Sequence, residues 1–182
     1  MTEADLKRLR VLVVGGKAAN VQILRTAFGL IGIRLITAIQ EPARAVEALR
    51  MQSFNAIFCD AAAGKVEKMP FHIAARRAPG ILNPMTPLFV IYSHARQRSV
   101  EQARDNGVTD VLTHPVSAAT IARKLEAAIA SPRNFIVAPT FFGPDRRTER
   151  SNTWYGGERR KRATRKTRMV MPEPVPGDVS FV

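Results

Sequence analysis

The sequence contains a single cysteine, Cys59, and no long apolar run. One cysteine cannot form an intramolecular disulfide or a multi-cysteine zinc site. A membrane-spanning helix needs roughly 18 consecutive apolar residues, and no uninterrupted apolar stretch approaches that length. The amino-terminal residues MTEADLKRLR are polar and lack the apolar segment of a signal peptide. These absences predict a cytoplasmic protein that makes no membrane contact.

The sequence also lacks a standard phosphate-binding loop, and acidic residues are few. The stretch GGKAAN fits neither G-x-x-x-x-G-K-[ST] nor G-x-G-x-x-G, and we interpret it as a tight turn between a strand and a helix. Lys and Arg number 28 against 15 Asp and Glu, for a formal net charge of +13. Residues 131–182 hold 11 of those basic residues and 5 of the acidic ones. This charge favours polyanions or acidic proteins as partners.

Apolar periodicity predicts alternating strands and helices between residues 9 and 130. The expected strands are short apolar runs at 11–14, 34–39, 55–60, 87–93 and 110–115. The expected helices follow them at 20–31, 41–52, 71–77, 97–107 and 117–130. Such alternation predicts parallel strands joined by right-handed crossovers, with helices on both faces of the sheet. The fold class is therefore α/β.

In parallel sheets of this kind, ligands and chemistry collect beyond the carboxyl ends of the strands. The residues there are Gly15, Gly16, Asp60, Ser93, His94 and His114. Asp60, His94 and His114 could form a two-histidine, one-carboxylate metal site. Alternation along the strand disfavours this arrangement, because His94 should point away from the side to which Ser93 points. A site that takes a small anion without a metal is a further hypothesis.

After residue 131 the periodicity stops and prolines and arginines accumulate, which predicts a mostly disordered tail over 131–182. The apolar pieces NFIV and TFFG could still lie against the domain. The tail also repeats one phrase, FFGPDRR at 141–147 and WYGGERR at 154–160. Its aromatic and basic residues suit either a protein groove or single-stranded RNA. The candidate docking residues are Phe141, Phe142, Arg146, Arg147, Trp154, Tyr155, Arg159 and Arg160.

Three segments resemble the receiver domains of bacterial two-component response regulators. FNAIFCD resembles the strand that ends in their phosphoacceptor aspartate, which places that role at Asp60. PLFVIYSHA resembles the strand that ends in their switch hydroxyl, here Ser93. GVTDVLTHP resembles their Gly-Ala-Asp-Asp-Tyr-Leu-Thr-Lys-Pro segment. This last match places the lysine at His114, the aromatic switch at Val111 and a cis-proline at Pro115.

The resemblance implies a flavodoxin-like, doubly wound sheet of five parallel strands in the order 2-1-3-4-5. It covers residues 9–130, with an amino-terminal extension over 1–8 and the basic tail over 131–182. Receiver domains hold Mg²⁺ with two acidic residues after the first strand, and Gly15 and Gly16 occupy those positions here. Asp60 with backbone carbonyls makes a poor site for an ion that prefers an octahedron of oxygens. The family's lysine is a permanent cation, and a histidine stands in its place at position 114.

We therefore expect a degenerate, single-domain response regulator that is not an enzyme and needs no cofactor. It would act through contacts with a histidine kinase, a phosphotransfer protein or another regulator. The family's usual contact surface corresponds to 97–106, 110–114 and 117–130. Two alternatives stay open at this stage. One is a nucleic-acid-binding adaptor that uses the tail, and the other is a conventional receiver phosphorylated on Asp60.

Overall fold

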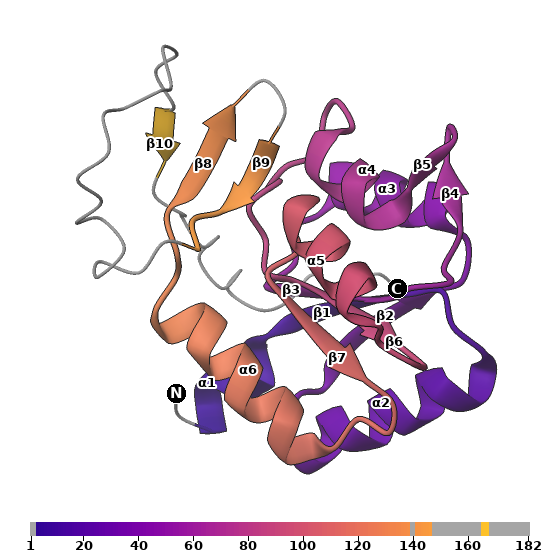
Figure 1. The fold of residues 1–182 in the computed structure, drawn as a ribbon. Coiled ribbons are helices and arrows are strands. Elements are labelled where there is room, and N and C mark those ends of the chain that lie inside the picture. Colours follow the sequence, from indigo (N-terminus) through magenta and orange to yellow (C-terminus); the bar gives the residue numbers. More distant parts are fainter. Residues whose placement is uncertain (1–2, 139–140, 147–164, 168–182) are drawn as a thin grey trace.

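Five parallel strands form the central sheet of the protein (Figure 1). In this computed structural model the described residues are 3–138, 141–146 and 165–167. The strands are β1 (Arg10–Val14), β2 (Leu35–Ile39), β3 (Ala56–Asp60), β6 (Leu88–Tyr92) and β7 (Asp110–Thr113). They pair in the order β2-β1-β3-β6-β7. The predicted order of five parallel strands is confirmed.

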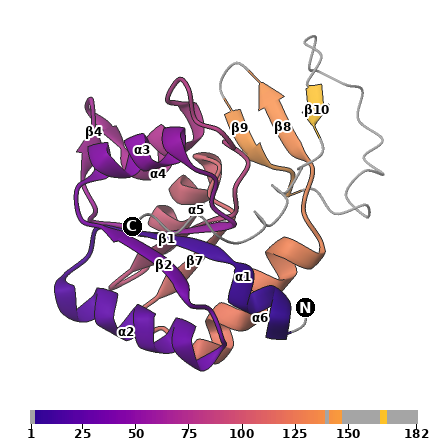
Figure 2. The same cartoon turned by 180° about the vertical axis from the view of Figure 1, so that it is seen from behind.

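Helices cover both faces of the sheet (Figures 1 and 2). One face carries α2 (Ala18–Leu30) and α6 (Ala118–Ala130). The short helix α1 (Glu3–Arg8) packs against the same core through Leu6. The other face carries α3 (Pro42–Met51), α4 (Phe71–Arg77) and α5 (Gln97–Asp105). No helix among these described ranges is long and apolar enough to cross a bilayer.

Two apolar cores fill the space between the sheet and its helices. Successive side chains of a strand point to opposite faces, so Val11 and Val13 enter one core and Leu12 and Val14 the other. This explains why β1 is apolar at every position after Arg10 rather than alternating. In the first core the Phe58 ring contacts two other rings. Its centroid lies 5.0 Å from that of Phe28 and 4.7 Å from that of Phe89.

The structure contains elements that periodicity did not predict. Besides α1 they are β4 (Lys65–Val66), β5 (Met69–Pro70), β8 (Phe135–Ala138), β9 (Phe141–Pro144) and β10 (Arg165–Thr167). The last three form an antiparallel sheet in the order β10-β8-β9. The apolar pieces after residue 131 thus become strands, because they pair with each other and Phe135 is buried. The rest of the predicted disordered tail lies outside the described residues.

Candidate functional site

The carboxyl edge of the central sheet brings together most of the residues singled out from the sequence. Asp60 ends β3, and its Oδ1 accepts a hydrogen bond from the Ala62 backbone N–H at 2.8 Å. The loops after β1, β3, β6 and β7 are contiguous because those strands are neighbours in the sheet. Ser93 and His94 follow β6, and both are exposed. His114 follows β7 and is half-buried.

Gly15 and Gly16 lie beside Asp60, where the family places its metal-binding acids. Both have positive φ, 69° and 84°, a conformation that favours glycine. A Cβ on Gly15 would lie 2.6 Å from the Ala63 Cα, so the loop after Asp60 leaves no room for a side chain there. A Cβ on Gly16 would lie 3.3 Å from Asp60 Oδ2. The site therefore offers a single carboxylate, Asp60, which is a poor donor set for an ion that prefers an octahedron of oxygens.

The structure also places the other positions that the sequence resemblance singled out. The His114–Pro115 peptide bond is cis, as predicted. Val111 is half-buried against the second core. As a branched aliphatic residue it has no aromatic ring that could move between a buried and an exposed position. Its neighbour Asp110 makes an ion pair of 2.5 Å with Lys124 on α6. No cluster of three or more His, Cys, Asp or Glu that could hold a metal ion occurs within the part of the chain that the structure describes.

Cys59 precedes Asp60 and is an inert core thiol. Its side chain is 1% exposed, and burial with the nearby Asp60 charge raises the pKa of the thiol well above its usual range. Because thiolates are the reactive form, we expect native Cys59 to react with a thiol reagent only at the rate of global unfolding. Reaction with 5,5′-dithiobis(2-nitrobenzoate), followed with and without urea, checks this. Fast reaction of the native protein would contradict it.

The β8–β9 hairpin docks at the opposite, amino-terminal edge of the sheet, beside the turn between α5 and β7. Gly143 of β9 and Gly107 of that turn approach so closely that a Cβ on Gly143 would lie 2.5 Å from the Gly107 Cα. Gly107 also has a φ of 82°. Two glycines therefore permit backbone-to-backbone contact, which any side chain would prevent.

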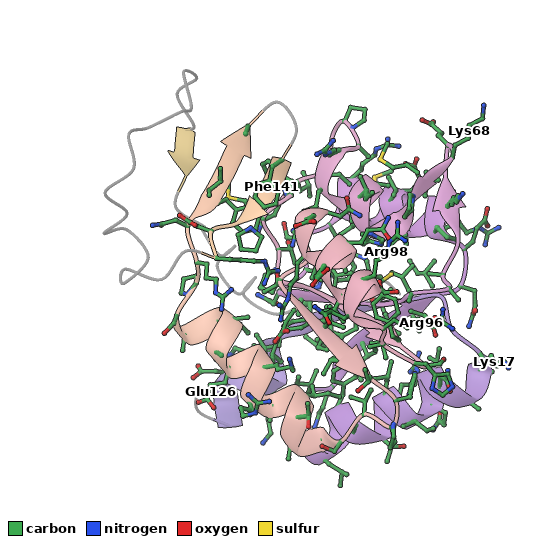
Figure 3. The ribbon with its side chains drawn as sticks, viewed as in Figure 1. Lys17, Lys68, Arg96, Arg98, Glu126 and Phe141 are labelled. Atoms are coloured by element: carbon green, nitrogen blue, oxygen red, sulfur yellow. The ribbon has the colours of Figure 1, made fainter. Side chains whose placement is uncertain are left out.

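Side chains of the first phrase complete this docking. Arg146 donates hydrogen bonds to the carbonyl oxygens of Val108 and Thr109. The Phe142 ring packs on Phe135, with centroids 5.5 Å apart. The described part of the first phrase, residues 141–146, thus lies against its own domain, so Phe142 and Arg146 are engaged within the chain. Phe141 lies half-buried on β9 (Figure 3).

The second phrase stays a prediction. Trp154, Tyr155, Arg159 and Arg160 lie outside the described residues, as does Arg147 of the first phrase. The structure therefore places only the first copy.

Arg76 on α4 links the hairpin to the domain, and sequence reasoning missed it. It is 4% exposed and donates hydrogen bonds to the carbonyl oxygens of Gly107, Pro84 and Thr86. Its guanidinium also lies over the Phe135 ring, 5.3 Å from the centroid. Burial lowers the pKa of Arg76 to about 9, so it stays charged at neutral pH. No local pattern indicated this role, because its partners lie up to 59 residues away in the sequence.

A cavity of about 70 Å³ lies between α6, the sheet and the hairpin. Its walls include Phe89, Phe135 and Pro144, with Lys124 and Arg133 also in the lining. It belongs to the amino-terminal edge of the sheet and is separate from Asp60 at the carboxyl edge. The hairpin creates this cavity, since Phe135 and Pro144 form part of its wall.

Comparison with solved structures identifies the fold. The chain is similar to the receiver domain of a sensor histidine kinase from Pseudomonas aeruginosa, at 21% identity and a TM-score of 0.58, over 68% of this chain and 98% of that one. A response regulator from Desulfuromonas acetoxidans matches at 17% identity and a TM-score of 0.60, over 67% and 97%. CheY in a CheX complex from Borrelia burgdorferi matches at 14% and 0.56, over 66% and 89%. No family model and no curated protein matches the sequence. The central sheet and its helices therefore have the fold of a response-regulator receiver domain.

Proposed function

We propose that the protein acts in two-component signalling as a degenerate receiver domain that binds partner proteins without Mg²⁺-dependent phosphorylation. It is a non-enzymatic module. The fold supports the signalling role, since the similar structures are receiver domains. The observation that supports the degenerate state is the pair Gly15 and Gly16, which supply no carboxylate, and at Gly15 the Ala63 backbone leaves no room for a side chain.

The remaining chemistry of the site supports the same proposal. Phosphoryl transfer depends on positioning and on neutralising charge at the transferred group. Asp60 lacks the second carboxylate that would help to hold Mg²⁺, and His114 replaces a permanent cation. The partners proposed are a histidine kinase, a phosphotransfer protein or another regulator. The family's usual contact surface corresponds to α5, β7 and α6, and the Asp110–Lys124 ion pair joins β7 to α6 there.

Acetyl phosphate tests the loss of phosphorylation. We expect full-length protein incubated with acetyl phosphate and Mg²⁺ to show no stoichiometric phosphoryl incorporation, because the site cannot hold the ion. Intact mass spectrometry checks this, with Asp60→Asn as the matched variant of unchanged shape. Incorporation that needs Mg²⁺ and disappears in Asp60→Asn would establish a conventional receiver instead.

Affinity capture tests the partner class. Full-length protein captures its partners from a lysate of the source cell, with and without nuclease treatment. A Trp154→Ala/Tyr155→Ala variant is the control for the second phrase, because it leaves the docked hairpin intact. Loss of a kinase or regulator band in α5 surface variants such as Arg98→Glu supports the proposal. Recovery of only nuclease-sensitive material would favour the nucleic-acid-binding alternative.

A further inference from the structure

Basic side chains stand without acidic partners around the carboxyl edge of the sheet. Lys17, Lys68, Arg96 and Arg98 are exposed (Figure 3). None of them takes part in the ion pairs or side-chain hydrogen bonds found among the described residues. Unpaired surface cations are common on a chain of charge +13, so their position needs a second argument.

The topology places three of these cations on adjacent loops. Lys17 follows β1, Lys68 follows β3 and Arg96 follows β6. Because β3 lies between β1 and β6 in the sheet, the three loops form one continuous edge. Figure 3 shows Lys17, Arg96 and Lys68 along the same side of the molecule. Asp60 is the carboxylate at which β3 ends on this edge.

The loop that carries Lys68 is strained. Strands β4 and β5 are joined by a two-residue turn, Glu67–Lys68, with Val66 paired to Met69. Both turn residues have positive φ, 48° and 70°. Such hairpin turns strongly prefer Asn-Gly, because side chains disfavour this conformation. Strained positions of this kind persist where the surroundings hold them, and they gather at functional sites. A lysine therefore stands at the tip of the hairpin in a conformation for which glycine would be more stable.

We infer that this edge docks an acidic segment of a partner protein, with Lys17 and Arg96 as the central contacts and Lys68 at one end. The inference rests on the proposed function, since it supplies the place and charge of a protein partner. Opposite charge steers such encounters and sets their specificity. In a site without Mg²⁺, the cations of the chain itself provide the positive charge that meets the partner.

The composition of the edge favours a protein over a nucleic acid. Single-stranded nucleic acids bind chiefly by base stacking on large aromatic rings, and the loops after β1, β3 and β6 carry no Phe, Tyr or Trp. Tyr92, the last residue of β6, is half-buried and donates its hydroxyl proton to the Ser99 carbonyl oxygen. Asp60 and Glu67 also lie among the cations. A protein segment can offer these carboxylates a basic residue, which a phosphate backbone cannot do.

A labelled acidic peptide tests the surface directly. The probe is fluorescein-labelled octaglutamate, titrated with full-length protein and followed by anisotropy at low salt. Removing two exposed charge contacts in Lys17→Ala/Arg96→Ala should weaken binding about tenfold. The matched control is Arg8→Ala/Arg34→Ala, which removes the same charge from exposed sites at the amino-terminal edge. The control should leave the affinity within about twofold, since a remote charge is screened.

The strained turn gives a second, independent test. Lys68→Gly relieves the positive φ, so its melting temperature should rise while octaglutamate affinity falls about threefold. Glu67→Gly relieves the same kind of strain and removes an acid, so its melting temperature should also rise with no loss of affinity. A lysine with a purely structural role would show no such separation.

Three outcomes would overturn the inference. The first is that the edge variant and the control variant lose the same amount of octaglutamate affinity, and the second is that the unchanged protein does not bind octaglutamate. The third is that an RNA of equal charge displaces octaglutamate at a lower concentration than unlabelled octaglutamate does. The proposed function can fail separately. Lysate capture without any kinase or regulator would remove the signalling role, yet edge-dependent octaglutamate binding would still define a surface for an acidic protein.

Discussion

Arg76→Ala should lower the free energy of unfolding by about 3–5 kcal/mol, the largest effect of any single substitution considered for this protein. The guanidinium is buried and satisfies the carbonyl oxygens of Gly107, Pro84 and Thr86. Alanine leaves those three acceptors without a donor, and it removes the group that lies over Phe135. Urea unfolding followed by circular dichroism measures the change.

The control for Arg76 is Arg123→Ala, an exposed arginine on α6. It should change stability by no more than about 0.5 kcal/mol, as is usual for surface positions. Arg76→Lys should fall between the two, because an ammonium keeps the charge but lacks the planar fork that reaches several carbonyls. A loss below about 1 kcal/mol in Arg76→Ala would show that the hairpin is held to the domain by other contacts.

Gly107→Ala should cost about 2–4 kcal/mol and release the β8–β9 hairpin from the domain. The added Cβ would overlap the Phe142 carbonyl oxygen and lie 3.1 Å from its carbon. That neighbour is backbone, which cannot rotate away. Amide hydrogen exchange over β8 and β9 should therefore become much faster, while exchange in β1 and β3 stays slow.

Two other glycines separate the causes of this loss. Gly80 also has a positive φ, 80°, but a Cβ there would meet only the Arg50 side chain at 3.7 Å. Gly80→Ala should thus show the strain alone, about 1 kcal/mol. Gly29 lies in α2 with no atom within 4 Å of an added Cβ, so Gly29→Ala should stabilise the protein by about 0.5–1 kcal/mol. If Gly107→Ala and Gly80→Ala lost the same free energy of unfolding, the overlap with the Phe142 carbonyl would have no part in the loss at Gly107.

The central fold could be predicted because its information is local and periodic. Runs such as Val11–Val14 are apolar at every position, which indicates a strand buried on both faces. Asp60 and Pro115 could be located by their matching segments. Sequence also showed that Gly15 and Gly16 stand where the resembling receiver domains carry acidic residues. It could not show that the backbone at Ala63 fills the space beside Gly15, because that contact joins loops 48 residues apart.

The tail shows the limit of local patterns. FFGPDRR has the composition of an exposed docking phrase, and its first copy docks on its own domain. Phe135, Phe142 and Arg146 find partners on α4 and on the turn at Gly107, which are remote in sequence. Hydrogen bonds to backbone carbonyls leave no signature in the residue types that accept them.

The sequence by itself determined the five-stranded α/β domain, the position of Asp60 at a strand end and the two glycines, Gly15 and Gly16, after the first strand. These follow from periodicity and from residue types at fixed places. Only the tertiary structure decided that the first phrase completes the domain, that Arg76 holds it there, and that a strained turn presents Lys68 at the carboxyl edge. Each of these depends on which backbone atoms meet across the fold, and such contacts have no local pattern to predict them.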